Sequence, residues 1–130
     1  MTNQELIAMA KEVMTKAYAP YSHFQVGAAL LAKDGRVFTG CNVENATYGA
    51  TICAERTAVT KAVSEGVREF EKIAIVASSG DYAAPCGICR QVLFEFMPEG
   101  KVVLWSELEE EKEFALAELL PFGFRGEDIK

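Results

Sequence analysis

Three cysteines lie where their sulfurs could bind one metal ion. Cys86 and Cys89 form a Cys-x-x-Cys pair, and Cys53 lies well upstream of it. Residues i and i+3 share one face of a helix, so both sulfurs of the pair can reach the same ion. Three thiolates with an open fourth position are typical of a catalytic zinc site, because structural zinc sites are usually closed by four ligands. The pattern therefore favours a catalytic zinc bound by these three cysteines.

Glu55 follows Cys53 closely, in the segment Cys53-Ala54-Glu55-Arg56. A carboxylate beside a metal-activated water can accept the proton of that water and pass it on, which is general acid–base catalysis. An isolated glutamate in the first turn of a helix usually only offsets the helix dipole. Next to three cysteines, Glu55 is predicted to be the catalytic acid and base.

Two other interpretations of the cysteines remain open. A Cys-x-x-Cys pair can be a redox pair, although the context of a thioredoxin-like motif is missing here. A closed structural zinc site would need a fourth ligand, and Cys41 and His23 are the remaining cysteine and histidine. Cys41 lies within a predicted strand, where a free cysteine commonly packs as a small apolar residue. His23 is expected to be a loop or core histidine.

The helices and strands predicted from the apolar pattern place the cysteines at one edge of a sheet. Cys53 opens one helix and the pair Cys86 and Cys89 opens the next, and both helices adjoin strands of the same sheet. Helix N-termini favour negative charge and lower the pKa of thiols, which suits metal binding. The predicted helices span residues 3–16, 52–65, 86–96 and 117–120, and the predicted strands span residues 26–32, 37–43, 72–78, 102–105 and 114–116.

The order of these elements is typical of an α/β fold. Strands that alternate with helices predict parallel pairing at the centre of the sheet. Asp34-Gly35 between two apolar runs predicts a β-hairpin. Residues 106–113 are too few for a crossover helix, so the last strand is expected to run antiparallel to its predecessor. The length of 130 residues favours one domain over residues 1–130.

The composition excludes several classes of protein. The formal net charge of −6 argues against a protein that binds nucleic acid through a basic face. The first residues lack the basic and apolar regions of a signal peptide, and no apolar stretch is long enough to cross a membrane. We therefore expect a cytoplasmic protein with reduced cysteines and with no nucleic-acid or membrane partner. The acidic run over residues 107–113 is expected to be a solvated turn.

Cys-Ala-Glu followed downstream by Pro-Cys-x-x-Cys resembles the zinc-dependent cytidine deaminases, in which three cysteines are an accepted ligand set. Residues 24–29, 39–45 and 119–124 are similar to further segments of that family. The resemblance implies a three-layer α/β/α sandwich with a mixed five-stranded sheet, one zinc per subunit and a homotetramer. It also implies hydrolytic deamination of cytidine and 2′-deoxycytidine to uridine and 2′-deoxyuridine, with release of ammonia.

The same resemblance implies a role for each residue of the site. By this resemblance the zinc ligands are Cys53, Cys86 and Cys89, and the proton shuttle is Glu55. Asn42 and Glu44 would hold the ribose 3′-hydroxyl, and Phe24 and Ala54 would also contact the substrate. Tyr48 and Phe124 would reach the site of a neighbouring subunit. Alternate residues of a strand face the same way, so the side chains at positions 42 and 44 can reach one sugar. For Phe24, ordinary core packing is the alternative.

Arg56 is expected to act on the metal site through its charge. Zinc(II) with three thiolates carries a net charge of about −1, which makes it a weaker Lewis acid than zinc with a neutral histidine ligand. A guanidinium close to Cys53 can donate hydrogen bonds to the sulfurs and offset that charge. An ordinary surface arginine is the alternative. Arg90 is a weaker candidate for the same role, and Gln91 is expected to orient one of the two arginines.

Two rival functions remain at the level of sequence. One is a related deaminase that acts on a nucleobase, on another aminated nucleoside or on a polynucleotide. The acidic charge of the chain argues against a polynucleotide, and Glu44 would repel a 3′-phosphate. The other rival is a non-catalytic zinc module, which would have a closed coordination shell and no deaminase activity.

Overall fold

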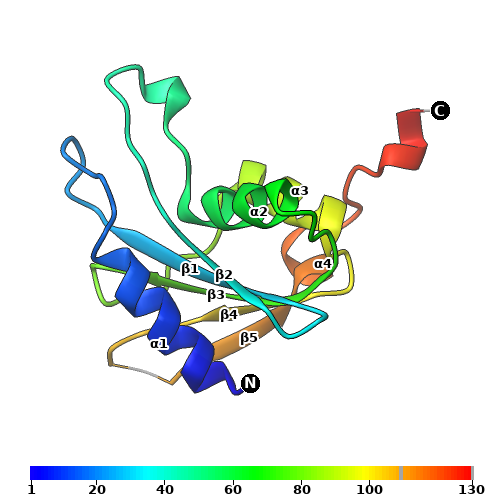
Figure 1. Cartoon of the computed structure of the whole chain (residues 1–130), viewed down its shortest axis with the longest axis horizontal. Helices are drawn as coiled ribbons and strands as arrows, with labels where there is room; N and C mark the ends of the chain where they lie inside the picture. The colour runs from blue at the N-terminus through cyan, green and yellow to red at the C-terminus, as the bar shows by residue number, and fades with distance from the viewer. Residues whose placement is uncertain (109, 130) are drawn as a thin grey trace.

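The computed structural model describes residues 1–108 and 110–129, which form a sheet with helices on both faces (Figure 1). In chain order the elements are α1 (Asn3–Met14), β1 (Val26–Ala32), β2 (Val37–Cys41), the 3-10 helix η1 (Tyr48–Ala50), α2 (Ala54–Ser64), β3 (Phe70–Ala77), α3 (Gly87–Phe96), β4 (Lys101–Leu104), β5 (Lys112–Ala115), α4 (Leu116–Leu119) and the 3-10 helix η2 (Gly126–Ile129). Within the acidic run of the sequence, Glu109 lies outside the described residues. Among the described residues, no helix is both long and apolar enough to cross a membrane.

The sheet has the strand order β2-β1-β3-β4-β5 and is mixed. β1 pairs antiparallel with both β2 and β3, β3 pairs parallel with β4, and β5 runs antiparallel to β4 as expected. Parallel pairing at the centre is therefore confirmed for β3 and β4 only. β2 and β3 also run in the same direction, but the hairpin places β1 between them. The hairpin turns at Gly35, whose φ of 95° favours glycine.

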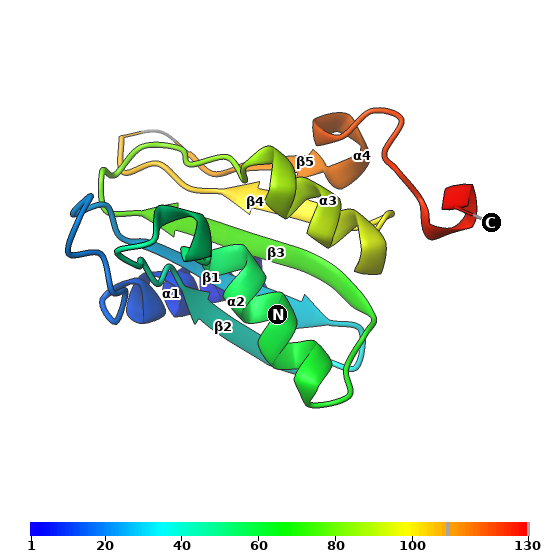
Figure 2. The same cartoon turned by 90° about the horizontal axis from the view of Figure 1, so that it is seen from above.

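Each face of the sheet is covered by its own hydrophobic cluster. α1 packs on one face through Leu6, Ile7 and Ala10, and α2 and α3 pack on the other (Figure 2). Along β1, Ala28 and Leu30 belong to the α2–α3 side, whereas alternate residues of the same strand belong to the α1 side. This burial on both faces explains the unbroken apolar runs of the sequence. The predicted three-layer α/β/α sandwich with a mixed five-stranded sheet is confirmed.

Gly40 allows α2 to lie directly against β2. A Cβ atom at this position would be 2.5 Å from the carbonyl oxygen of Ala54 and 2.5 Å from the backbone nitrogen of Ala58. Both of these backbone atoms belong to α2, so no side-chain rotation could relieve the contact. The glycine therefore sets the distance between the sheet and the first turn of α2.

Most predicted boundaries shift by one or two residues. α1 ends at Met14 and β2 ends at Cys41, so both elements are two residues shorter than predicted. Beyond β2 the chain leaves the sheet, and Val43 forms isolated bridges with Tyr18 and Ile52. Residues 42–44 therefore belong to an irregular segment that is held by local contacts.

Candidate metal centre and active site

The three cysteines converge at the N-termini of α2 and α3. β2 and β3 run in the same direction, so the loops after both strands start at the same edge of the sheet and lead into these two helices. Cys53 is the N-cap of α2, Cys86 is the N-cap of α3, and Cys89 lies buried in the first turn of α3. The three Sγ atoms all lie within 4.8 Å of one another.

The spacing of the sulfurs fits a tetrahedral zinc site. Sulfurs that are each about 2.3 Å from zinc lie about 3.8 Å apart in a tetrahedron. The Sγ atoms of Cys53 and Cys86 are 3.9 Å apart, and all the cysteines are free thiols. Cys41 and His23 are not part of the described cluster, which leaves a fourth position open. The donor set therefore fits the predicted zinc.

Hydrogen bonds stabilise negative charge on Cys53. The pKa of its thiol falls to about 5, because the Cys89 side chain and the Arg56 guanidinium both hydrogen-bond to its sulfur. Arg56 Nη2 lies 3.4 Å from Cys53 Sγ and 3.4 Å from the carbonyl oxygen of Thr51. The interaction with Cys53 and burial together raise the pKa of Cys89. Arg56 thus makes the contact with sulfur that was expected of it.

Glu55 is a buried carboxyl group beside the sulfurs. Its residue is only 5% exposed, although it lies in the first turn of α2. Burial raises the pKa of this carboxyl to about 7, and the nearby charge of Cys53 adds to the effect. A carboxyl group with such a pKa can both take up and release a proton near neutral pH.

Asn42 and Glu44 both contact the segment that precedes β1. The Asn42 side chain accepts a hydrogen bond from the Val26 nitrogen at 2.9 Å and donates one to the Phe24 carbonyl at 2.8 Å. The Glu44 carboxylate accepts from the backbone nitrogens of Tyr21 and Ser22 at 3.0 and 3.1 Å, and the Ser22 hydroxyl also donates to it. These hydrogen bonds lower the pKa of Glu44. The two side chains therefore reach the same stretch of chain, although residues 42–44 lie beyond the end of β2, and their contact with one sugar stays a prediction.

The partners of Glu44 were not found from the sequence. Ser22 and Tyr21 lie in a loop without periodic pattern, and no spacing signal connects them to position 44. In the structure they line a cavity of about 350 Å³ together with Glu44, Tyr48 and Thr51. Only the Tyr-Ser pair just before the first strand could have suggested a polar group at this place.

The aromatic residues implied to contact substrate lie at the surface. Phe24 is 41% exposed, which excludes the alternative of a core residue. Tyr48 is 75% exposed and packs edge-to-face against Tyr21, with 6.0 Å between ring centroids. Phe124 is 56% exposed. Ala54, by contrast, has no exposed surface in this structure.

Arg90 and Gln91 contact backbone carbonyls. The expected contact between Gln91 and an arginine is not among the hydrogen bonds of the described residues, because the Gln91 amide donates to the Phe124 carbonyl at 2.7 Å. The Arg90 guanidinium donates to the carbonyls of Pro85 and Leu119 at 2.7 and 2.8 Å. Both side chains therefore hold the C-terminal segment against α3, which sequence reasoning missed.

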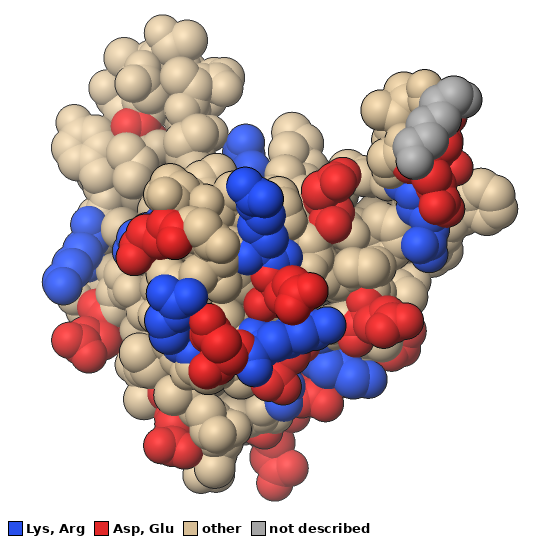
Figure 3. Space-filling view, turned by 45° about the vertical axis from the view of Figure 1, so that its right-hand side comes forward, with Lys and Arg blue, Asp and Glu red and all other residues tan. Residues whose placement is uncertain are grey.

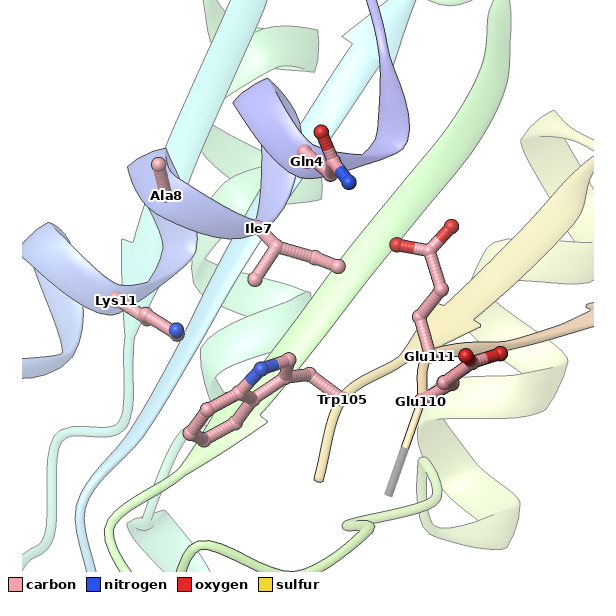
Figure 4. A pocket seen from close by; sticks show the side chains of 7 residues that line it. All are labelled: Gln4, Ile7, Ala8, Lys11, Trp105, Glu110 and Glu111. Carbon is pink, nitrogen blue, oxygen red and sulfur yellow. The ribbon is translucent and has the colours of Figure 1, made fainter. Parts of the chain in front are cut away.

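A larger cavity lies on the opposite side of the sheet. It measures about 550 Å³ and lies between α1 and the connection from β4 to β5, with lining residues Gln4, Ile7, Ala8, Lys11, Trp105, Glu110 and Glu111 (Figure 4). The Lys11 ammonium lies 3.9 Å from the centroid of the Trp105 ring. None of the three clustered cysteines lines this cavity, so it is separate from the metal centre.

Charged side chains of both signs are interspersed on the face shown in Figure 3. The projecting segment over residues 43–52 carries a single charged residue, Glu44. A continuous basic surface is not seen on this face among the described residues. The surface there differs from the basic footprint that nucleic-acid-binding proteins present.

Comparisons with known proteins agree with this site. A family model described as the cytidine and deoxycytidylate deaminase zinc-binding region matches residues 1–105. A cytidine deaminase from Sporosarcina psychrophila is 48% identical over 130 residues, which cover 99% of this chain and 96% of the relative. A cytidine deaminase from Halalkalibacterium halodurans is 51% identical, with 99% and 98% covered. The crystal structure of cytidine deaminase from Burkholderia pseudomallei superposes with a TM-score of 0.90 at 49% identity, over 95% of this chain and 100% of that chain.

Proposed function

The chain belongs to the cytidine and deoxycytidylate deaminase family, and on that premise we propose that it hydrolyses cytidine and 2′-deoxycytidine to uridine and 2′-deoxyuridine with release of ammonia. The observation that carries the proposal is the cluster of Cys53, Cys86 and Cys89 with the buried carboxyl of Glu55 beside it. We also infer that residues 1–130 form one deaminase domain.

Cys53, Cys86 and Cys89 are the residues that would hold zinc. Zinc, when bound, supplies the Lewis acidity that makes water a nucleophile near neutral pH. The helix N-termini and the Arg56 guanidinium favour the thiolate forms that bind the ion. Arg56 also offsets the excess negative charge of three thiolates, which would otherwise weaken that Lewis acidity.

Glu55 moves the protons of the reaction. Its carboxylate accepts a proton from the water that attacks C4 of the pyrimidine and delivers this proton to N3. It then takes the second proton of that water from the hydroxyl now on C4 and transfers it to the amino group, so that ammonia leaves and the C4 carbonyl forms. A pKa of about 7 suits both directions of transfer, because the group is close to half-protonated at neutral pH.

The residues around Glu44 support a free nucleoside as the substrate. The Glu44 carboxylate can accept a hydrogen bond from a ribose hydroxyl, and the Asn42 amide can donate one to it or accept one from it. A carboxylate at this place would repel a 3′-phosphate, and the chain as a whole carries a net charge of −6. We therefore propose that this site binds a free nucleoside and that the protein has no nucleic-acid or membrane partner. We also propose a cytoplasmic location.

We further propose that the enzyme is a homotetramer in which neighbouring subunits complete each pocket. The support is three exposed aromatic residues, of which Phe24 and Tyr48 lie beside Asn42 and Glu44, and Phe124 lies in the segment that Gln91 holds on α3. Aromatic residues are enriched in surfaces that are buried on association.

Metal analysis and an ammonia-release assay together test the proposal. The compounds assayed are cytidine, 2′-deoxycytidine, cytosine, adenosine and a cytidine-containing oligonucleotide. We expect about one zinc per chain and release of ammonia from the two cytosine nucleosides. Release from cytosine, adenosine or the oligonucleotide alone would favour the rival deaminases. Bound zinc without release from any compound would indicate a structural zinc module and contradict the proposal.

A further inference from the structure

Arg90 joins the loop before the zinc ligands to the C-terminal segment. It directly follows Cys89 in α3 and is half-buried. Its Nε donates a hydrogen bond to the Pro85 carbonyl at 2.7 Å, and its Nη1 donates to the Leu119 carbonyl at 2.8 Å. Pro85 immediately precedes Cys86, and Leu119 is the last residue of α4. One side chain therefore contacts both the metal-binding loop and the start of the C-terminal segment.

The C-terminal segment, residues 119–125, contacts α3, the helix that carries Cys89, through several side chains. Gln91 Nε2 donates to the Phe124 carbonyl at 2.7 Å. Gly123 approaches Phe94 so closely that a Cβ atom would lie 2.8 Å from the ring. The Arg125 guanidinium lies 5.2 Å from the centroid of the same ring. Apart from the Arg90 contact, these interactions involve α3 alone and do not reach the loop before Cys86.

We propose that Arg90 is a positioning residue that couples zinc binding to the docking of residues 119–125. An ion that holds the sulfurs of Cys86 and Cys89 fixes the loop at Pro85, and so fixes the carbonyl that orients the guanidinium. The guanidinium is planar and rigid, so fixing its Nε–H also aims its Nη1–H at Leu119. This inference rests on the proposed zinc site, but it does not depend on which nucleoside is deaminated.

The guanidinium is suited to this role because it donates in two directions at once. A lysine ammonium is a single compact charge and lacks the rigid fork, so it could not hold both carbonyls in a fixed relation. Each bond is charge-assisted and stronger than a bond between neutral groups. Loss of zinc should therefore weaken the hydrogen bond to the Leu119 carbonyl. The segment that follows, up to Phe124, should then detach from α3 more often.

Limited trypsin digestion of the full chain measures this coupling at the Arg125–Gly126 bond. Arg125 and Gly126 are exposed, but a protease binds several residues on each side of the bond in an extended form, so the residues held on α3 must detach before cleavage and the cleavage rate reports docking. The proteins compared, each zinc-loaded and chelator-treated, are the wild type, Arg90→Met, Arg90→Lys, Gln91→Ala and the matched surface variant Arg36→Met. Arg36 pairs with Asp34 in the hairpin turn, far along the chain from α3.

Zinc should slow cleavage by about tenfold in the wild type and in Arg36→Met, which is the effect expected for one charge-assisted hydrogen bond. In Arg90→Met and Arg90→Lys the zinc-loaded rate should rise to that of the zinc-free wild type, and zinc should no longer change it. Gln91→Ala should be cleaved faster in both states but should keep the zinc effect, because Gln91 does not contact Pro85. A merely structural arginine would speed cleavage without removing the dependence on zinc.

Three results would overturn the inference: an undiminished zinc effect in Arg90→Met, loss of the zinc effect in Gln91→Ala as well, or no zinc effect in a wild type that metal analysis shows to be loaded. If Arg90→Met fails to fold, Arg90→Lys carries the test. A wild type that binds no zinc would instead contradict the proposed function. Activity is not needed for any of these measurements, so the two failures are distinguishable.

Discussion

Glu55 is the residue whose replacement tests the proposed chemistry most directly. In Glu55→Gln the side chain keeps its shape but cannot move a proton, so kcat/KM should fall by about a thousandfold or more. The three sulfurs are untouched, so metal analysis should still find zinc. Steady-state ammonia release and metal content of the same preparation provide the measurement. Substantial turnover in a zinc-loaded Glu55→Gln would show that another group moves the proton.

Replacement of Arg56 should lower both kcat and the affinity of the site for zinc. Replacing it with glutamine removes the guanidinium that lies 3.4 Å from Cys53 Sγ and leaves the negative charge of the thiolates less offset. Removal of such a supporting group typically lowers metal affinity or activity by about 10–100-fold. Zinc release to a chromophoric chelator and kcat, each compared with Arg36→Gln as the exposed control, would measure the two effects. Equal behaviour of the two variants would mean that Arg56 is an ordinary surface arginine.

At the scale of elements, the sequence indicated much of the fold but not its closest contacts. The hairpin at Gly35, the helix that begins after Cys53 and the helix that begins after Cys86 all follow from local signals, because caps and turns depend on a few neighbouring residues. The insertion of β1 between β2 and β3 depends on long-range pairing, which has no local signal. The bonds from Glu44 to residues 21 and 22 likewise join two irregular segments, where periodicity predicts nothing.

Gly40 gives a test of how firmly the sheet positions α2. In Gly40→Ala the new Cβ would meet the backbone of α2 at 2.5 Å, so the helix must move away from β2. We expect the free energy of unfolding to fall by about 1–3 kcal/mol in urea denaturation, as is usual for overpacking. Activity should fall too, since α2 carries Cys53 and Glu55. Gly49→Ala is the control, because a Cβ there meets nothing within 4 Å and stability should change by less than about 0.5 kcal/mol.

At the scale of the whole molecule, the exposed aromatic residues bear on whether the protein is a monomer or an oligomer. The Phe24 carbonyl is held by Asn42 of the same subunit, whereas Phe124 is held by its backbone to α3 and is 56% exposed. Aromatic residues are enriched in the surfaces that subunits bury, so we expect a partner to cover Phe124. Light scattering should therefore give a species of about four chains, and a fully active monomer would contradict the shared pocket.

Mixed tetramers would show directly whether Phe124 serves a neighbouring site. Phe124→Ala alone should raise KM, because each pocket loses an aromatic wall supplied by another subunit. Coexpressed with the inactive Glu55→Gln, some Phe124→Ala subunits receive an intact Phe124 from their neighbour and keep their own Glu55. Activity at low substrate concentration should then exceed the sum of the two variants measured separately. Phe122→Ala, which alters a fully exposed residue of the same segment, should leave KM close to that of the wild type. If the coexpressed pair shows only the sum, Phe124 acts within its own subunit, and the pocket is not shared through this residue.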